Sequence, residues 1–99
     1  MKLFAVIRTH GTAWQAESPL EGQTEWIGHA QFMNALEREG FVLLGGPLEG
    51  TSDVLLVVRA TAPGDIDDRL GSDPWTGLKL LRTSRISPWN LRLGSLPLG

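Results

Sequence analysis

Two residues of this sequence have the types that acid–base chemistry needs: His29, on the apolar face of an expected helix, and Asp73, in an Asp-Pro-Trp segment. An imidazole has an unperturbed pKa of about 6.5, so it can exchange a proton near neutral pH. A carboxylate that accepts a ring N–H orients the imidazole and stabilises its protonated form. We therefore predict that His29 and Asp73 form a catalytic pair. The alternative is structural, a histidine satisfied in the core and an aspartate that forms a turn.

Other residues could bind a small ligand beside this pair. Aromatic side chains can wall a ligand pocket, a guanidinium can bind an anionic group, and paired glycines let the backbone approach a ligand closely. The predicted ligand-binding residues are Arg8, Trp26, Gly45, Gly46, Pro47 and Trp75. A second interpretation stays open, in which Arg8 is a surface charge at a strand end and the tryptophans pack at a sheet edge or subunit interface.

Composition and missing motifs argue against several other kinds of site. The two histidines lie far apart and there is no cysteine, so we expect no metal site. GxGxxG, GxxxxGK[ST] and GxSxG are all absent, and we expect no cofactor and no serine triad. A net charge of −2 without a basic patch argues against nucleic acid. Short apolar runs, no signal-peptide pattern and no cysteine favour a cytoplasmic protein that contacts no membrane.

Hydrophobic periodicity predicts the order β-α-β-β-α-β, with strands over residues 2–8, 41–45, 53–60 and 78–86. The first helix should begin before Gly22, because Ser18-Pro19-Leu20-Glu21 fits a capping box with proline at the first helical position. It should end near Glu39, with Gly40 as its left-handed cap. The second helix is expected over residues 63–70, followed by a turn over residues 73–77.

This order is the ferredoxin-like, split βαβ arrangement, an α+β fold. We expect one domain over all 99 residues, with a core over about 2–93 and an extended tail over 87–99. The sheet order should be four, one, three, two, with both helices on one face. This topology would bring the candidate residues to one end of the sheet.

The middles of the first and third strands are apolar on both sides, whereas a sheet with one face in water should alternate. We therefore predict a homodimer in which a second copy covers the open sheet face. The alternative is that residues 87–99 fold back over that face.

Four motifs in this order resemble the YCII-related (YciI-like) proteins, over about residues 3–93. They are WxxHxxFMxxL from Trp26, GFVLLGGP from Gly40, DPW followed by Gly77, and IxPW from Ile86. The resemblance implies a dimeric α/β barrel of ferredoxin-like protomers with His29 and Asp73 as an acid–base pair. A similar protein is a dehydrochlorinase of a chlorinated hydroxyhydroquinone. The long loop over residues 9–23, with Trp14, departs from the shorter family members.

Together these features predict a small enzyme of lyase or isomerase type, in which His29 moves a proton on a small organic molecule. The alternative function is a noncatalytic dimeric module that binds a ligand or partner and uses His29 and Asp73 as a structural pair.

Overall fold

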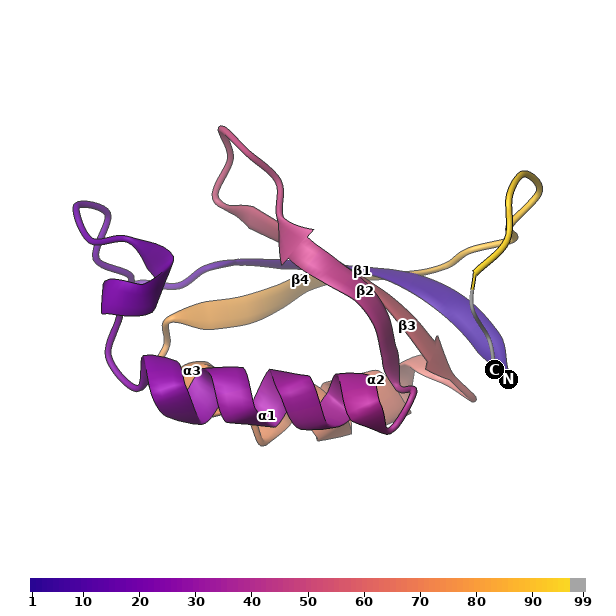
Figure 1. Ribbon diagram of the computed structural model, residues 1–99, viewed down its shortest axis with the longest axis horizontal. Coiled ribbons are helices and arrows are strands. Elements are labelled where there is room, and N and C mark those ends of the chain that lie inside the picture. The colour runs from indigo at the N-terminus through magenta and orange to yellow at the C-terminus, as the bar shows by residue number, and fades with distance from the viewer. Residues whose placement is uncertain (97–99) are drawn as a thin grey trace.

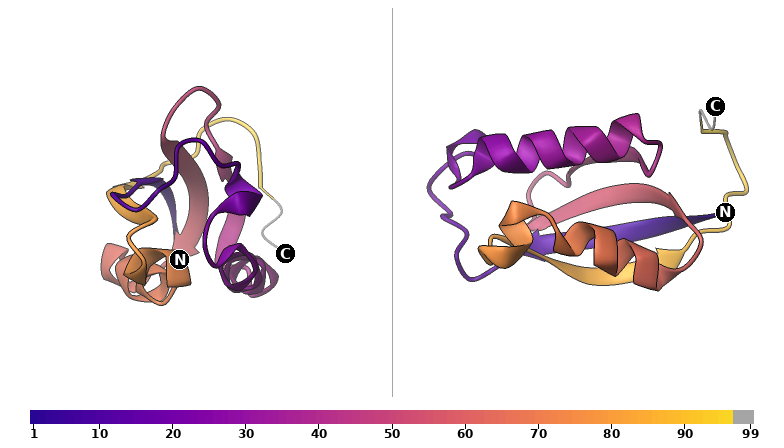
Figure 2. Two further views of the ribbon diagram at one scale, coloured as in Figure 1. Left: turned by 90° about the vertical axis from the view of Figure 1, so that its left-hand side faces the viewer. Right: turned by 90° about the horizontal axis from the view of Figure 1, so that it is seen from below.

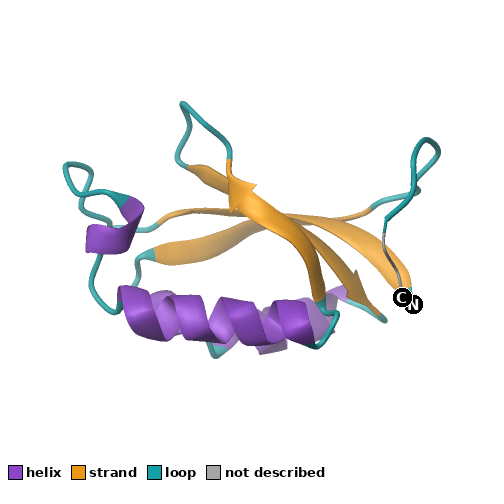
Figure 3. Ribbon diagram, in the orientation of Figure 1, coloured by secondary structure: helices purple, strands orange, loops and turns teal. Residues whose placement is uncertain are grey.

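In the computed structural model, which describes residues 1–96, a four-stranded antiparallel sheet carries the helices on one face (Figures 1 and 3). The elements in chain order are β1 (Lys2–His10), the 3-10 helix η1 (Leu20–Gly22), α1 (Trp26–Arg38), β2 (Val42–Pro47), β3 (Asp53–Ala60), α2 (Pro63–Gly71), α3 (Pro74–Gly77) and β4 (Leu81–Pro88). The predicted ferredoxin-like α+β fold is confirmed. Figure 2 shows α1 and α2 side by side across the sheet.

The sheet order is β2-β3-β1-β4, as predicted. Along β1, Phe4, Val6 and Arg8 are buried beneath the helices, and the residues between them are only partly buried. Ala5 pairs with Val57 of β3, and both lie on the face that carries no helix. The strands in the centre of the sheet therefore have apolar side chains on both faces, and no helix covers the open face, on which Val57 is only 4% exposed.

Two buried clusters fill the layer between the sheet and the helices. The first, which we call the apolar cluster, consists of Phe4, Val6, Leu36, Val42, Leu56, Val58, Ala60, Ile66 and Leu70. The second, which we call the tryptophan cluster, consists of Trp75, Leu80 and Leu81, with Trp14, Leu20, Trp26 and Val54 packed against it. The tryptophan cluster lies at the end of the sheet where α1 begins, and it positions the site.

The start of α1 differs from the sequence prediction. The helix begins at Trp26, and Ser18 caps nothing, because residues 20–22 form the separate helix η1. Glu25, the residue before α1, has a left-handed conformation with φ 59°, which prevents a continuous helix from η1 into α1. The end of α1 is as predicted: Gly40 has φ 78°, and its N–H donates to the Glu37 carbonyl at 2.9 Å.

Other boundaries also differ from the predictions. β1 continues to His10 instead of ending at residue 8, β2 covers Val42–Pro47 instead of residues 41–45, and β4 ends at Pro88 instead of residue 86. Residues 74–77 form one helical turn, α3, where a simple turn was expected. β4 begins at Leu81 and not at residue 78, because the Leu78 and Leu80 N–H groups still bond back to the carbonyls of α3. Lys79 between them has φ 61°, a left-handed conformation that ends the helical turn and redirects the chain into the strand.

The chain beyond β4 leaves the sheet at the end where the chain begins (Figure 1). The Trp89 N–H donates to the Leu3 carbonyl at 2.9 Å, and Leu93 is 88% exposed. Leu93 therefore does not pack on the sheet, and the last part of the predicted tail, residues 97–99, lies outside the described residues. No helix within residues 1–96 is long and apolar enough to cross a membrane.

Candidate active site

Asp73 lies at the start of α3, where α2 ends, and is 1% exposed. Its Oδ1 accepts the Trp75 backbone N–H at 3.0 Å, so it caps the helical turn, as expected for an Asp before Pro. Its two carboxylate oxygens also accept hydrogen bonds from side chains of β1 and α1. Asp73 therefore does more than form a turn, because it joins three elements at one point.

Arg8 reaches Asp73 from the sheet. Its Nη1 lies 2.8 Å from Asp73 Oδ2, and its Nη2 donates to Thr76 Oγ1 at 2.6 Å. The Thr76 hydroxyl donates in turn to the Leu70 carbonyl at 2.7 Å. Arg8 is 1% exposed, so the interpretation of Arg8 as a surface charge is wrong. Its position beneath the helices follows from the alternation of β1, in which Arg8 shares a face with Phe4 and Val6.

His29 reaches Asp73 from the first turns of α1. Its Nδ1 lies 2.9 Å from each oxygen of the Asp73 carboxylate. The imidazole stacks on the indole of Trp75, with ring centroids 3.7 Å apart and planes 4° apart. Because a carboxylate can only accept, Nδ1–H must be the donor to Asp73, and in the neutral form of the ring the free lone pair is on Nε2. The His29 side chain also lines the cavity described below.

Burial, hydrogen bonds and nearby charges together set the protonation state of Asp73. Burial by itself would raise the pKa of Asp73, but the hydrogen bonds from His29 and the Trp75 N–H, with the charges of His29 and Arg8, lower this pKa below its usual value. Burial lowers the pKa of Arg8, and the charge and hydrogen bond of Asp73 oppose that shift. Asp73 is thus a carboxylate at neutral pH, able to stabilise a proton on His29.

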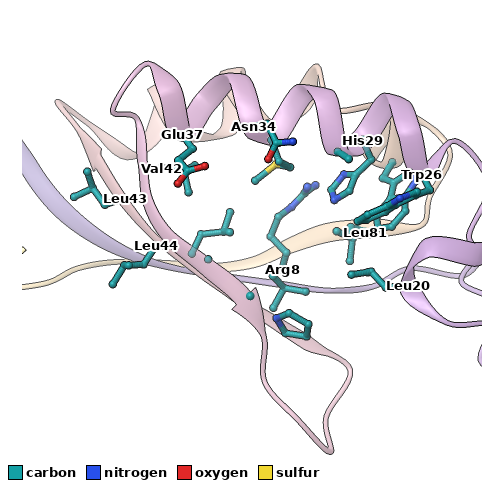
Figure 4. A pocket seen from close by; sticks show the side chains of 18 of the residues that line it. Arg8, Leu20, Trp26, His29, Asn34, Glu37, Val42, Leu43, Leu44 and Leu81 are labelled. Atoms are coloured by element: carbon teal, nitrogen blue, oxygen red, sulfur yellow. The ribbon is translucent and has the colours of Figure 1, made fainter. Parts of the chain in front are cut away.

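A cavity of about 390 Å³ lies between α1 and the sheet, next to this network (Figure 4). His29, Trp26 and Leu20 lie at one end, and Glu37 and Leu43 lie at the other. Seven of the residues named from the sequence line this cavity: Arg8, Trp26, His29, Gly45, Gly46, Pro47 and Trp75. Asp73 does not line it and lies behind His29. The structure therefore brings the predicted residues together around one cavity.

The two glycines of β2 differ in their surroundings. A Cβ on Gly45 would lie 2.7 Å from Leu56 Cδ2, on the face of the sheet that borders the cavity. A Cβ on Gly46 would meet nothing within 4 Å. The absent side chain at Gly45 therefore keeps part of the cavity open, whereas Gly46 has no such packing requirement.

Three tryptophans surround the histidine end of the cavity. Trp75 is fully buried, and its indole N–H donates to the Thr24 carbonyl at 2.6 Å. The rings of Trp26 and Trp14 lie 5.9 and 5.5 Å from the Trp75 ring, measured between centroids. Trp89 is 42% exposed and lies after β4, away from this cluster. Three of the four tryptophans thus form walls, as aromatic residues of ligand sites do.

The sequence did not reveal several of the site residues. Thr76, which accepts from Arg8, followed no recognisable pattern. Met33 and Glu37 also line the cavity, and their spacing of four and eight residues after His29 on α1 could have identified them. Among residues 1–96 there is no group of three His, Cys, Asp or Glu side chains that could hold a metal ion. His29 and Arg8 have side chains of the types that can exchange a proton and donate hydrogen bonds.

No protein-family model matches this chain, and no curated protein matches its sequence. Its fold is shared with a solved enzyme. That enzyme is the 5-chloro-2-hydroxyhydroquinone dehydrochlorinase (TftG) from Burkholderia phenoliruptrix AC1100, in complex with 2,5-dihydroxybenzoquinone. The two structures superpose with a TM-score of 0.56 and 19% identity, covering 93% of this chain and 95% of that chain. At this identity the likeness establishes the fold alone.

Proposed function

We propose that this chain is a cytoplasmic acid–base enzyme of lyase or isomerase type, related to the YCII-like proteins. One observation carries the proposal: buried Asp73 accepts from Arg8 and from His29 Nδ1 beside a cavity, which leaves His29 Nε2 as the base. A structural histidine needs no adjacent cavity. The shared fold of a dehydrochlorinase supports the proposal.

The reaction step follows from these positions. His29 Nε2 takes a proton from a carbon beside a carbonyl group, and the electron pair of the broken C–H bond moves to the carbonyl oxygen as an enolate. An N–H of Arg8 stabilises the enolate, and Asp73 stabilises the imidazolium. Return of the proton to another carbon gives an isomer, whereas loss of an anionic leaving group from the neighbouring carbon gives elimination.

The proposed ligand is a small planar carbon ring that carries carbonyl or hydroxyl groups. The cavity of about 390 Å³ is within the range for small-ligand sites, and tryptophan walls suit a flat ring. Within the described residues, Arg8 Nε is a buried donor with no hydrogen-bond partner, so its N–H could donate a hydrogen bond to a ligand oxygen. The ligand of the dehydrochlorinase, 2,5-dihydroxybenzoquinone, has this chemistry, and we call it the one-ring probe.

The test measures proton transfer directly. Small ring ketones and hydroxyquinones are incubated in D₂O with the protein, and deuterium uptake at carbon is followed by NMR. The wild type should accelerate uptake for at least one compound, and His29→Gln should slow it about 10²- to 10⁴-fold. The control is Gln31→Ala, an exposed position of α1 that does not line the cavity. A His29→Gln protein as fast as the wild type would refute the assignment, as would a wild type that accelerates nothing.

A noncatalytic binding module remains the second candidate, because Asp73 also caps α3 and pairs with Arg8. The two functions differ in the stability of His29→Gln. In the enzyme, Asp73 keeps its Arg8 and Trp75 partners without His29, so the variant should stay folded with only a modest loss. If the pair is structural, His29→Gln should unfold at much lower denaturant concentration than the wild type.

We also propose that the protein is a homodimer joined through the open sheet faces. Ile7 of β1 pairs with Leu55 of β3 on that face, next to the Ala5–Val57 pair, so the centre of the face is apolar. The Ile7→Glu variant should be a monomer by light scattering at micromolar concentration, while Gln31→Glu on α1 should keep the dimeric mass. A monomeric wild type would overturn this proposal.

A further inference from the structure

The loop over residues 11–25, which joins β1 to α1, contributes two side chains to the cavity, Trp14 and Leu20. Trp14 stacks on His10, with centroids 3.8 Å apart and planes 10° apart, and it meets the Trp75 ring edge-on at 5.5 Å. Figure 1 shows this loop at the end of the sheet where α1 begins. The loop therefore forms an end wall of the cavity, on the side where His29 lies.

A buried amide inside the loop holds its shape. Gln23 is 3% exposed, and its Oε1 accepts the Gln15 backbone N–H at 3.0 Å. Its Nε2 donates to the Gln15 carbonyl at 2.8 Å and to the Ser18 carbonyl at 3.1 Å. The Gln23 side chain thus supplies hydrogen bonds to backbone groups that no strand or helix pairs, and one of its partners, Gln15, directly follows Trp14 in the chain.

Both ends of the loop are fastened to the site. At its start, the N–H groups of Gly11 and Ala13 donate to the Leu80 and Lys79 carbonyls at 2.8 and 3.0 Å. A Cβ on Gly11 would lie 2.2 Å from the Lys79 carbonyl oxygen, so this contact requires glycine. At its end, the Thr24 carbonyl accepts the Trp75 indole N–H at 2.6 Å. A loop held at both ends and in its middle is a fixed wall.

We propose that this loop determines which ligands the site accepts. Trp14 is the specificity-determining residue, because its ring limits how far a flat ligand can extend past His29, and Gln23 is the positioning residue that holds Trp14 in place. The wall limits how far a flat ligand can extend toward Trp14, so we expect a one-ring ligand to fit there better than a fused two-ring one. This inference rests on the proposed ligand class, and it adds residues to the site that the acid–base chemistry does not need.

The positioning role of Gln23 is tested without any ligand. In Gln23→Ala, the backbone N–H of Gln15 and the indole N–H of Trp75 should exchange with D₂O at least about tenfold faster than in the wild type. NMR measures both rates under conditions where the protein is folded. The matched control is Gln15→Ala in the same loop, because Gln15 takes part only through its backbone. Unchanged exchange at both protons in Gln23→Ala would overturn the positioning role.

The specificity role is tested by binding of the one-ring probe and of a two-ring probe, 2-hydroxy-1,4-naphthoquinone. The wild type should prefer the one-ring probe. Trp14→Ala should shift the ratio of the two dissociation constants toward the two-ring probe by roughly 10- to 100-fold. Gln23→Ala should shift it in the same direction by less, and Gln15→Ala should leave it unchanged. A purely structural Gln23 would lower stability without moving this ratio.

The outcomes separate this inference from the proposed function. If the wild type binds the one-ring probe and Trp14→Ala leaves the ratio unchanged, the wall is wrong and the proposed function stands. If the wild type binds neither probe, the proposed ligand class is wrong, and the exchange rates in Gln23→Ala alone decide whether the loop is a positioned wall.

Discussion

The apolar cluster and the tryptophan cluster lie in the same layer between the sheet and the helices, yet they are built differently. The apolar cluster contains aliphatic side chains and one phenylalanine, and of its buried members only Val42 and Leu56 line the cavity. The tryptophan cluster borders a cavity of about 390 Å³ and three polar side chains, of which Arg8 and Asp73 are almost completely buried. Burial of apolar area stabilises the first, whereas the second includes an ion pair whose desolvation offsets much of its attraction.

This difference shows where the layer between the sheet and the helices contains buried polar groups and open space instead of apolar packing. At the end of the layer away from Asp73, apolar side chains fill the space between the sheet and the helices. At the other end, Asp73 collects hydrogen bonds from β1, α1 and α3, and an open space remains beside His29. Removing one partner of a buried ion pair costs much stability, so the two clusters should respond differently to substitution and to pH.

The largest expected effect is at Asp73. Asp73→Ala leaves the Arg8 charge buried without its partner and removes the cap of α3, so the free energy of unfolding should fall by about 3 to 5 kcal/mol. Leu70→Ala in the apolar cluster should cost about 2 to 5 kcal/mol through lost burial and a cavity. Denaturant unfolding of both variants measures the comparison. A loss below about 1 kcal/mol at Asp73 would show that the network contributes little to the fold.

The pH dependence of stability should separate the clusters further. The pKa of Asp73 is lowered in the folded protein, so its stabilising effect is complete above the unfolded value of about 3.9 and is lost as the pH falls through the lower folded value. The stability gap between the wild type and Asp73→Asn should thus narrow as the pH falls below about 4. The gap between the wild type and Leu70→Ala should not change with pH. Unfolding curves of all three proteins in acid provide the measurement.

A smaller effect is expected at the glycines of β2. Gly45→Ala pushes a methyl group against the movable end of Leu56, so stability should drop by about 1 kcal/mol or less while the cavity narrows. Gly46→Ala has open space around it and should stay within about 0.5 kcal/mol of the wild type. Affinity for the one-ring probe should fall in Gly45→Ala and hold in Gly46→Ala. Equal affinities would show that this part of the cavity holds no ligand.

Much of this arrangement was predictable from the sequence. The order of strands and helices followed from periodicity, and the order placed His29, Asp73, Trp26 and Trp75 at one end of the sheet. The Gly40 cap was predictable because helices commonly end on a left-handed glycine just after the last residue of the apolar pattern. These features depend on local pattern and topology, which the sequence expresses directly.

Other features depend on side-chain contacts between distant residues, and the sequence does not express those. Arg8 at the end of a strand suggested a surface charge, and only the packing of α3 over β1 shows that it is buried against Asp73. The capping box at Ser18 matched its pattern, yet the Gln23 amide organises the loop differently and α1 begins later. The hydrogen bonds of Gln23 to Gln15 and Ser18, which lie within eight residues of it, outweighed the capping pattern.

In the proposed function, Asp73 holds His29 with its proton on Nδ1, which leaves Nε2 as the base that acts on the ligand. NMR of the ¹⁵N-labelled imidazole tests this claim directly, at a pH where the ring is neutral. We expect the Nδ1–H form in the wild type, a shift toward the Nε2–H form in Asp73→Asn, and a change at Nε2 when the one-ring probe is added. A wild-type His29 with its proton on Nε2, or a ring that no probe perturbs, would contradict the account.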